Sequence, residues 1–402
     1  MAAEGFAGLR VVEAADEREE ALIVAIALRE TLEQPGAHAA LVTPDRGLAE
    51  RVAVELKRWG VEVDDSAGLP LGRWPAGSLL RLILEAVLAE MSPVSLVLLL
   101  AHPLCRLGLG RDALVRGAAA LEIGTWRGQA VGRGMPGLEA ALGNWEAIRE
   151  GGHVPRPRRR LTAEDRAAAV EVLHALGAAS AALREAFAAE KLALAALVTA
   201  AREAVTALSL SRAGAPLAFV GPDGEALAGL FDELAGAEAV MPPGGTARDC
   251  VAILDGLLAE TVVKRAAPGY PRVAIWGLLE ARLLEADHVV RGGLNETVWP
   301  PQTTTDSFIN RPMRAELGLS PPERRVGQTA HDFVLAALAP EVTLTRPRKA
   351  GEAETIASRF WQRLQAVTPQ SIWTKAVDEG AKLRALAGVL SAPADAKPIG
   401  RP

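Results

Sequence analysis

The stretch VAIWGLLEARLLEADHVVRGGLNETVWPP, from Val273 to Pro301, decides the fold of this chain. It predicts a strand, a helical turn, a second buried strand and then a glycine-rich loop that carries Trp299. Two polar clusters, Glu280–Arg282 and Leu294–Glu296, follow the predicted strands. Open α/β sheets bind ligands at the carboxyl ends of their parallel strands. We therefore expect the two strands to be neighbours, with these polar residues at a ligand-facing edge.

The N-terminal part of the chain predicts further strands of the same parallel sheet. Strands are expected at Leu9 to Glu13, Ala39 to Thr43 and Val61 to Asp64. Helices are expected between them, over Asp16 to Glu33 and from Asp45 to Trp59. Strand, helix and strand at this spacing form a βαβ unit, which builds a parallel sheet.

The middle of the chain differs in composition. It is rich in alanine and predicts helices, one of them opened by the capping box Thr162–Asp165. Strand signals return only in the opening stretch and at Glu341 to Thr345. We therefore predict an α/β fold in which one parallel sheet is interrupted by a large Ala-rich helical insertion.

Four segments follow from this pattern. Residues 1–95 are the first part of the sheet domain, 96–258 the helical insertion, 259–368 the second part of the sheet domain, and 369–402 a linker. The linker is argued from the Pro/Ala-rich ending SAPADAKPIGRP. We expect a chain that stops on such a linker to be part of a longer protein.

Composition limits the classes of function. The chain has 402 residues and a net charge of −5, which argues against a generally basic nucleic-acid-binding surface but leaves room for a local basic groove. Its two cysteines, Cys105 and Cys250, support neither a disulfide framework nor a metal cluster. Charges at Asp16 to Glu20 argue against a signal peptide, and no apolar run has the length of a membrane span. We expect a cytoplasmic protein.

No motif for catalysis or cofactor binding is complete. Gly132 to Gly137 matches the dinucleotide pattern G-x-G-x-x-G, but the residues before it make a poor strand and Pro136 lies inside it. The chain has no G-x-x-x-x-G-K-S/T phosphate loop and no serine in a nucleophile elbow. The one suggestive histidine pair, His331 and Asp332, is expected to be structural or on the surface, since adjacent helical residues point in different directions. We therefore expect no catalytic residue and no metal site.

Clusters of cations are the better candidates for function. Four arginines lie between Arg156 and Arg160, among them Arg158 and Arg159, and for these we favour a solvated linker over phosphate contact. Two further sets lie after the Trp299 turn and just past the last predicted strand: Arg311, Arg314, Arg324 and Arg325, then Arg346, Arg348 and Lys349. Cations beyond strand ends can meet phosphates, although several are expected to pair with acids such as Glu316 and Glu323.

Trp299 has two interpretations. Its ring either stacks on a base, as aromatic side chains do on single strands, or closes the loop against the core. We favour the second slightly.

The order of these motifs carries a family resemblance. The matching segments are Ala39–Arg46, Glu55–Gly60, Val61–Gly68, Leu279–Arg282, Ala286–Asp287, Gly293–Glu296, Val298–Pro301, Arg311–Arg314, Pro322–Gly327 and His331–Phe333. With them the chain resembles the middle portion of the AddB subunits of AddAB helicase–nucleases, of the alphaproteobacterial type. More distantly, it resembles the second RecA-like domain of superfamily 1 helicases. The motifs cover most of the chain outside the helical middle.

The resemblance implies a RecA-like sheet and a role in processing DNA ends for double-strand break repair, in a heterodimer with an AddA-like subunit. It places Glu280, Arg282 and Glu296 in a nucleotide-coupling motif that is degenerate here, because the Lys-Gly pair of active helicases is missing. The DNA-binding candidates are then Asn295, Trp299, Arg158, Arg159, Arg311, Arg314, Arg324 and Arg325. The family usually has Gly at the position of Thr297. ATP, Mg and an iron–sulfur cluster belong to regions of the parent complex that this chain lacks.

Our leading hypothesis is a helicase-like segment that guides or scaffolds DNA, with no ATPase or nuclease activity of its own. One alternative is an ATPase half-site in which Arg324 or Arg325 completes a pocket from a missing first RecA-like domain. The other is a purely structural module that binds the AddA-like subunit.

Overall fold

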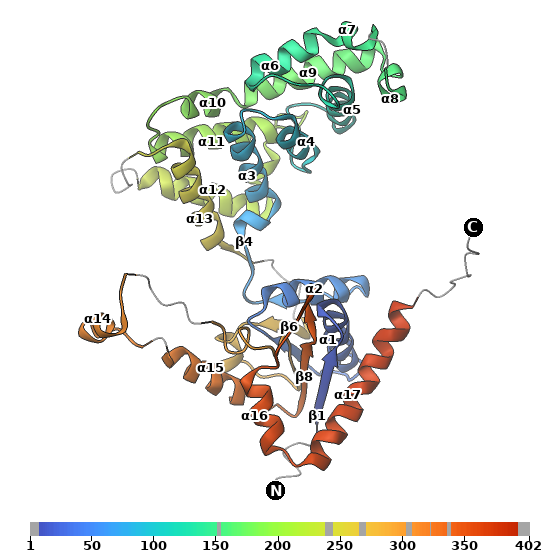
Figure 1. Ribbon diagram of the computed structural model, residues 1–402, viewed down its shortest axis with the longest axis vertical. Coiled ribbons are helices and arrows are strands. Elements are labelled where there is room, and N and C mark those ends of the chain that lie inside the picture. Colours follow the sequence, from blue (N-terminus) through green and yellow to red (C-terminus); the bar gives the residue numbers. More distant parts are fainter. Residues whose placement is uncertain are drawn as a thin grey trace. The chain divides into compact units, whose positions relative to one another are not determined.

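The chain forms two compact units (Figure 1). The computed structural model describes residues 8–150, 154–237, 244–264, 271–302, 308–321, 323–335 and 339–392. The sheet unit is made by the described residues of 1–67 and 265–402, and the helical unit by those of 68–264.

The sheet unit is built on six parallel strands in the order β1, β8, β7, β2, β6, β3. Their bounds are Leu9–Ala14 (β1), Ala39–Val42 (β2), Asp64–Asp65 (β3), Val273–Trp276 (β6), His288–Arg291 (β7) and Glu341–Pro347 (β8). The prediction of an α/β fold with a parallel sheet is confirmed. Because the strands are parallel, their carboxyl ends share one side of the sheet, which we call the carboxyl edge.

The two strands of the opening stretch are not neighbours, so that prediction was wrong. Strand β2 lies between β6 and β7 and pairs with both, Ala39 being in register with Val273 on one side and His288 on the other. All four residues of β2 are buried and apolar. Such a strand is most stable in the centre of a parallel sheet, where both faces are covered.

Helices cover both faces of the sheet. On one face, α1 (Glu17–Thr31) and α2 (Arg46–Arg58) pack over an aliphatic core. The carboxylates of Asp16 and Asp45 cap these helices by accepting backbone N–H groups of the first turn.

The other face is covered by an aromatic core. It takes Phe333 from α15 (Glu323–Leu335), Phe360 and Trp361 from α16 (Arg359–Val367), and Trp373 from α17 (Gln370–Ser391). The Trp361 and Trp373 rings meet edge to face with centroids 5.7 Å apart, a favoured arrangement for aromatic pairs. The remaining elements of the sheet unit are η6 (Glu280–Arg282), α14 (Arg311–Glu316), β9 (Lys349–Ala350) and β10 (Ala353–Glu354).

The helical unit packs around a core made chiefly of leucine, with alanine and valine between them. Its helices are α3 (Pro75–Leu88), α4 (Pro93–Ala101), α5 (Arg111–Leu121), α6 (Gly134–Gly143), α7 (Trp145–Glu150), α8 (Arg156–Arg159), α9 (Ala163–Ala179), α10 (Ala181–Phe187), α11 (Leu194–Ser209), α12 (Gly221–Gly236) and α13 (Ala247–Glu260). Its shorter elements are η2 (Leu71–Arg73), η3 (Glu122–Trp126), η4 (Leu217–Phe219) and the antiparallel pair β4 (Leu69–Pro70) and β5 (Val262–Val263). The predicted capping box at Thr162 and Asp165 is confirmed at the start of α9.

The unit boundaries differ from the predicted ones. They fall after residue 67 and after residue 264, whereas the sequence suggested 95 and 258. Helix α3 accounts for most of the shift at the first boundary. Its apolar residues, such as Leu79 and Ile83, belong to the core of the helical unit and not to either face of the sheet.

The predicted linker at 369–402 was wrong over most of its length. Helix α17 occupies Gln370–Ser391, and residues 393–402 lie outside the described residues. The buried positions of α17 recur every three or four residues: Trp373, Ala376, Gly380, Leu383 and Ala387. This stripe packs α17 against the edge strand β1 and against α1.

Two glycines of α17 provide a test of that packing. A Cβ atom at Gly380 would clash with the backbone carbonyl of Val11 in β1, whereas a Cβ at Gly388 has open space around it. We expect Gly380→Ala to lower the free energy of unfolding by about 2 kcal/mol or more through overpacking. Gly388→Ala, the matched control, should raise it by about 0.5–1 kcal/mol. Urea denaturation of both variants measures this, and equal effects of the two changes would contradict the packing of α17 on β1.

Candidate functional site

The polar residues of the opening stretch are held in structural contacts. Arg282 in η6 donates two hydrogen bonds to the carboxylate of Asp332 in α15, from Nε at 2.7 Å and from Nη2 at 2.9 Å. Asp332 is only 4% exposed, and its bond is the main reason that the pKa of Arg282 is raised. Glu280 lies half-buried in the same short helix. Arg282 therefore fastens α15 to η6, and Asp332 has the structural role expected of it.

Asn295 and Trp299 are also structural, so the DNA contacts predicted for them are not supported. The Asn295 side chain donates to the carbonyl of Pro347 at 3.2 Å and accepts from Nε of Arg346 at 3.1 Å. Trp299 is fully buried, donates to the carbonyl of Gly292 at 3.0 Å and meets Phe333 edge to face. A ring with no exposed face cannot stack on a base, and the core interpretation of Trp299 holds.

Glu296 joins the same loop to α16. Its carboxylate accepts from the backbone N–H of Arg359 at 3.1 Å and from Nε of that residue at 2.9 Å. The bond to Arg359 lowers the pKa of Glu296. Thr297 beside it has a φ of +75°, a left-handed conformation that favours glycine.

The cations at the end of β8 and just past it line a hollow at the carboxyl edge. We call it the basic pocket; its volume is about 470 Å³ and it is lined by Glu13, Ala15, Arg346, Arg348, Lys349, Glu354, Thr355 and Arg384. Arg346 is buried and pairs with Glu13, and Arg384 pairs with Glu19 at 3.1 Å. Arg348 and Lys349 are exposed, and among the described residues neither side chain has a partner.

This pocket has the features of an anion site. Its two paired arginines are fixed by carboxylates, while Arg348 and Lys349 can turn toward a ligand. It lies where β1 and β8 end, the edge at which parallel sheets bind ligands. Of its lining residues, the sequence singled out Arg346, Arg348 and Lys349 and missed Arg384, because α17 was expected to be a linker.

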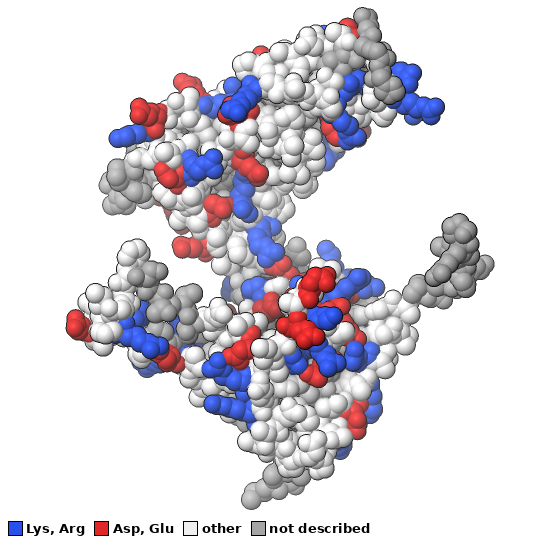
Figure 2. All heavy atoms as spheres, viewed as in Figure 1, with Lys and Arg blue, Asp and Glu red and all other residues white. Residues whose placement is uncertain are grey.

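The other predicted arginines differ in their availability. Arg158 is buried and donates to the backbone carbonyls of Ile123, at 3.0 Å, and Arg127, so it closes the end of η3 and is not a solvated or DNA-facing residue. Arg159 is exposed, and Figure 2 shows basic side chains near α8 on the face drawn.

The arginines in and around α14 and α15 lie at the surface, and three of them have side-chain or backbone partners. Arg311 forms an ion pair with Glu323, as the sequence suggested for that acid. Arg314 and Arg324 donate to Ser320, the first to its carbonyl at 3.2 Å and the second to its hydroxyl at 3.2 Å. Arg325 is exposed and has no side-chain partner within the described residues.

Arg291, at the end of β7, is a functional candidate that sequence reasoning missed. It is completely buried, and burial lowers its pKa to about 9, although the charge on Asp332 opposes this change. Among the described residues, its Nε and Nη1 atoms have no hydrogen-bond partner. The only signal was an arginine within the apolar run VVRGG.

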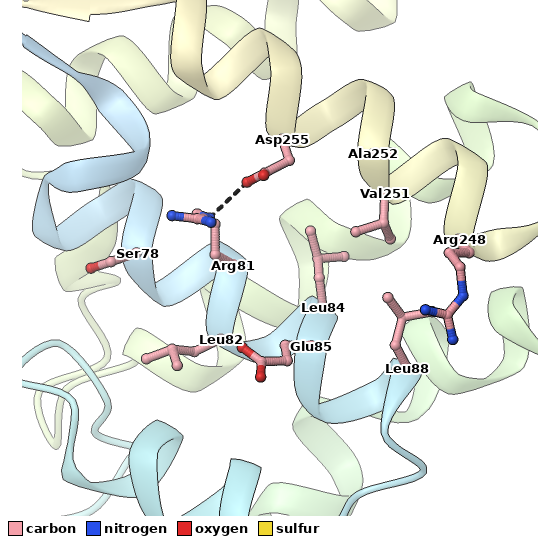
Figure 3. A pocket seen from close by; sticks show the side chains of 10 residues that line it. All are labelled: Ser78, Arg81, Leu82, Leu84, Glu85, Leu88, Arg248, Val251, Ala252 and Asp255. Carbon is pink, nitrogen blue, oxygen red and sulfur yellow. Dashed lines mark ion pairs between the residues drawn. The ribbon is translucent and has the colours of Figure 1, made fainter.

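The helical unit has a hollow of its own, about 520 Å³, between α3 and α13 (Figure 3). Leu84, Leu88 and Val251 give it apolar walls, and the ion pair between Arg81 and Asp255 crosses one end at 2.6 Å. These contacts fix the two helices to each other, and nothing in the hollow specifies a ligand.

Ser78, on the rim of that hollow, is not an activated nucleophile. Its hydroxyl lies 3.0 Å from Nε2 of His102, the geometry of a Ser–His pair. However, Nδ1 of His102 accepts the backbone N–H of Leu104 at 3.2 Å, so in the neutral ring Nε2 carries the proton. Nε2 then donates to Ser78, whose hydroxyl donates to the carbonyl of Pro75. Burial lowers the pKa of His102 and keeps the ring neutral.

Other types of site have little support. In the described residues, no group of three or more His, Cys, Asp and Glu side chains is placed to hold a metal ion. Both cysteines are buried and free. No single helix of the described part is long and apolar enough to cross a membrane; α9 and α10 pass the same test only as a pair bent by 52°. No known family model matches the chain, and no curated protein is significantly similar to it.

Glu20, also at the carboxyl edge, gives the sheet unit a pH dependence. Its buried carboxylate accepts from the N–H of Gly293 at 2.8 Å and the hydroxyl of Thr345 at 2.7 Å, and burial raises its pKa to about 7. Because the folded pKa lies above the unfolded value of 4.5, stability should fall as pH rises from about 5 to 7 and level off above. The loss should be on the order of 3 kcal/mol.

Glu20→Gln keeps an acceptor oxygen for both donors and cannot ionise. Denaturation at pH 5 and pH 8 should show the wild type losing more stability than this variant over that interval. The same pH dependence in both proteins would show that Glu20 does not titrate in this range.

Proposed function

We propose that the chain is an AddB-like segment of a helicase–nuclease, acting on DNA ends in the cytoplasm together with an AddA-like subunit. In this proposal its parallel sheet is a RecA-like domain and the helical unit is an insertion in it. Three features support the assignment: the parallel sheet, the contiguous helical segment between its two parts, and the left-handed φ of Thr297 at a position where the family usually has Gly.

The basic pocket is the observation that carries a role in DNA binding. Phosphate oxygens are bound by mobile Lys and Arg side chains, and such contacts fix a strand without reading its sequence. Arg348 and Lys349 provide two cations at the carboxyl edge that have no side-chain partner in the part of the chain that the structure describes, and Arg346 lies behind them. The exposed Arg311, Arg314, Arg324 and Arg325 would extend the contact along α14 and α15.

A guiding role fits the coupling motif better than a catalytic one does. Arg282 is bound to Asp332, Glu296 to Arg359, and Asn295 to the end of β8. These contacts direct the three side chains to structural partners at the carboxyl edge. In this role the chain positions a strand for a partner and needs no ATP of its own.

A purely partner-binding module is the second candidate. Helix α14 favours this candidate, because none of its residues is buried. Met313 within the helix is 47% exposed, and Leu317 at its C-terminal end is 64% exposed. Contiguous patches of exposed apolar side chains are typical of protein interaction sites.

Binding of a fluorescein-labelled single-stranded oligonucleotide to the full chain tests the proposal by fluorescence anisotropy. The double variant Arg348→Ala/Lys349→Ala should bind roughly tenfold more weakly at low salt, and its slope of log affinity against log salt should be smaller by about one to two.

Arg29→Ala is the matched control, since it removes a surface arginine from the last turn of α1, far along the helix from the carboxyl edge. Co-purification with an AddA-like subunit in the absence of any DNA binding, or equal losses in the control and the double variant, would favour the partner-binding module instead.

A further inference from the structure

Arg291 is buried without the hydrogen bonds that a buried guanidinium normally makes. It carries five N–H donors, yet Nε and Nη1 are unpartnered and Nη2 makes one bond of 3.3 Å, to the backbone carbonyl of Asp332. The guanidinium carbon lies 4.3 Å from the ring centre of Phe333 and 5.8 Å from that of Trp299. Buried polar groups left unsatisfied in this way are rare and call for an explanation.

The carboxylate nearest to Arg291 is already occupied. Both oxygens of Asp332 are bound by Arg282, so Asp332 offers Arg291 only its backbone carbonyl. The charge of Arg291 is therefore compensated by the faces of two aromatic rings and by the charge on Asp332, without a hydrogen bond to that carboxylate. Cation–π contacts are weaker than charge-assisted hydrogen bonds to an oxyanion.

Helix α15, which covers Arg291, is lightly attached to the sheet. Only Thr329, Asp332 and Phe333 of its described side chains are buried. Lifting α15 would break the Arg282–Asp332 ion pair and withdraw Phe333, and it would return the Arg291 guanidinium to water. The favourable hydration of that charge would offset part of the free energy needed to lift the helix.

Arg291 is also well placed for an anion. It ends a central strand at the carboxyl edge, and it is in register with Leu344 of β8. Arg346 of the basic pocket follows two residues later, on the same face of β8 and roughly 7 Å along the strand. An anionic strand bound in the basic pocket would pass close to Arg291.

We propose that α15 is a lid and that Arg291, once uncovered, binds a phosphate group of a nucleic-acid strand. The planar guanidinium fork suits the bidentate recognition of phosphate, and the unpaired Nε and Nη1 atoms become its donors. This inference rests on the proposed function. It adds a phosphate contact next to the basic pocket and a movement of α15 that accompanies binding.

Hydrogen exchange in α15, followed by mass spectrometry of the full chain with and without saturating oligothymidylate, tests the lid. In the wild type the oligonucleotide should speed exchange in residues 323–335. Arg291→Met should slow the basal exchange, because an apolar side chain suits the covered site better than an unpaired charge. The variant should also lose the response to the oligonucleotide and bind it roughly threefold to tenfold more weakly. Arg291→Lys, which keeps the charge, should retain part of the response.

Other outcomes overturn the lid. If Arg291 only holds α15 by stacking, Arg291→Met will speed the basal exchange and leave the oligonucleotide response intact. Binding that leaves exchange in α15 of the wild type unchanged removes the lid and spares the proposed function, whereas a complete lack of binding removes both. Should Arg291→Met not fold, Phe333→Ala replaces it: loosening the lid should raise both basal exchange and affinity, and a lower affinity would contradict the proposal.

Discussion

The loop from Gly292 to Trp299 is the constraint on which the sheet unit depends. Its backbone bonds to α1 through Glu20, to β8 through the carbonyl of Thr345, and to the start of α16 through Ser358. The Trp299 ring at its end fills the aromatic core beneath α15. Elements far apart in the sequence are thus fixed by one short loop that follows a central strand.

Two buried ionisable groups lie beside this loop: Glu20, which accepts the N–H of Gly293, and Arg291, which directly precedes it in the chain. Glu20 accepts hydrogen bonds from two donors, which suits its ionised form, while burial favours the protonated one. Among the described residues, two nitrogens of the Arg291 guanidinium have no hydrogen-bond partner, and none of its N–H groups donates to a carboxylate. The backbone at the carboxyl edge is therefore held by several hydrogen bonds, while the buried charges of Glu20 and Arg291 are only partly compensated. Buried polar groups without a partner are rare in native proteins and call for a specific explanation.

Much of the fold could be predicted from local signals. The strands at β1, β2, β6, β7 and β8 and the helices between the first of them follow from apolar runs and capping residues. The order of the strands could not be predicted, since the parallel pairing of β2 with both β6 and β7 depends on long crossovers. Helix α17 was missed, although its buried positions recur at helical spacing, because its Ala-rich composition and the Pro-containing end suggested a linker.

The candidate site was predictable in part. The cations at the end of β8 could be recognised in the sequence as a cluster. Which members of the basic pocket form ion pairs depends on where the fold places Glu13 and Glu19. Trp299, Asn295 and Glu296 were recognisable as a motif, yet their partners come from α15, α16 and β8, which no local pattern identifies. Arg291 was not recognised as a candidate from the sequence. An arginine in an apolar run is ordinary unless it is buried, and its burial depends on helix α15, which covers it.

Hydrophobic periodicity and capping depend on neighbours within a few residues, so most strands, several helices and the cation clusters could be recognised from the sequence alone. The tertiary structure alone decided which charges are free. Pairing and desolvation depend on distances across the fold, and for this reason Arg348 and Lys349 are exposed, Arg158 and Arg282 are structural, and Arg291 lies buried without a partner for two of its nitrogens.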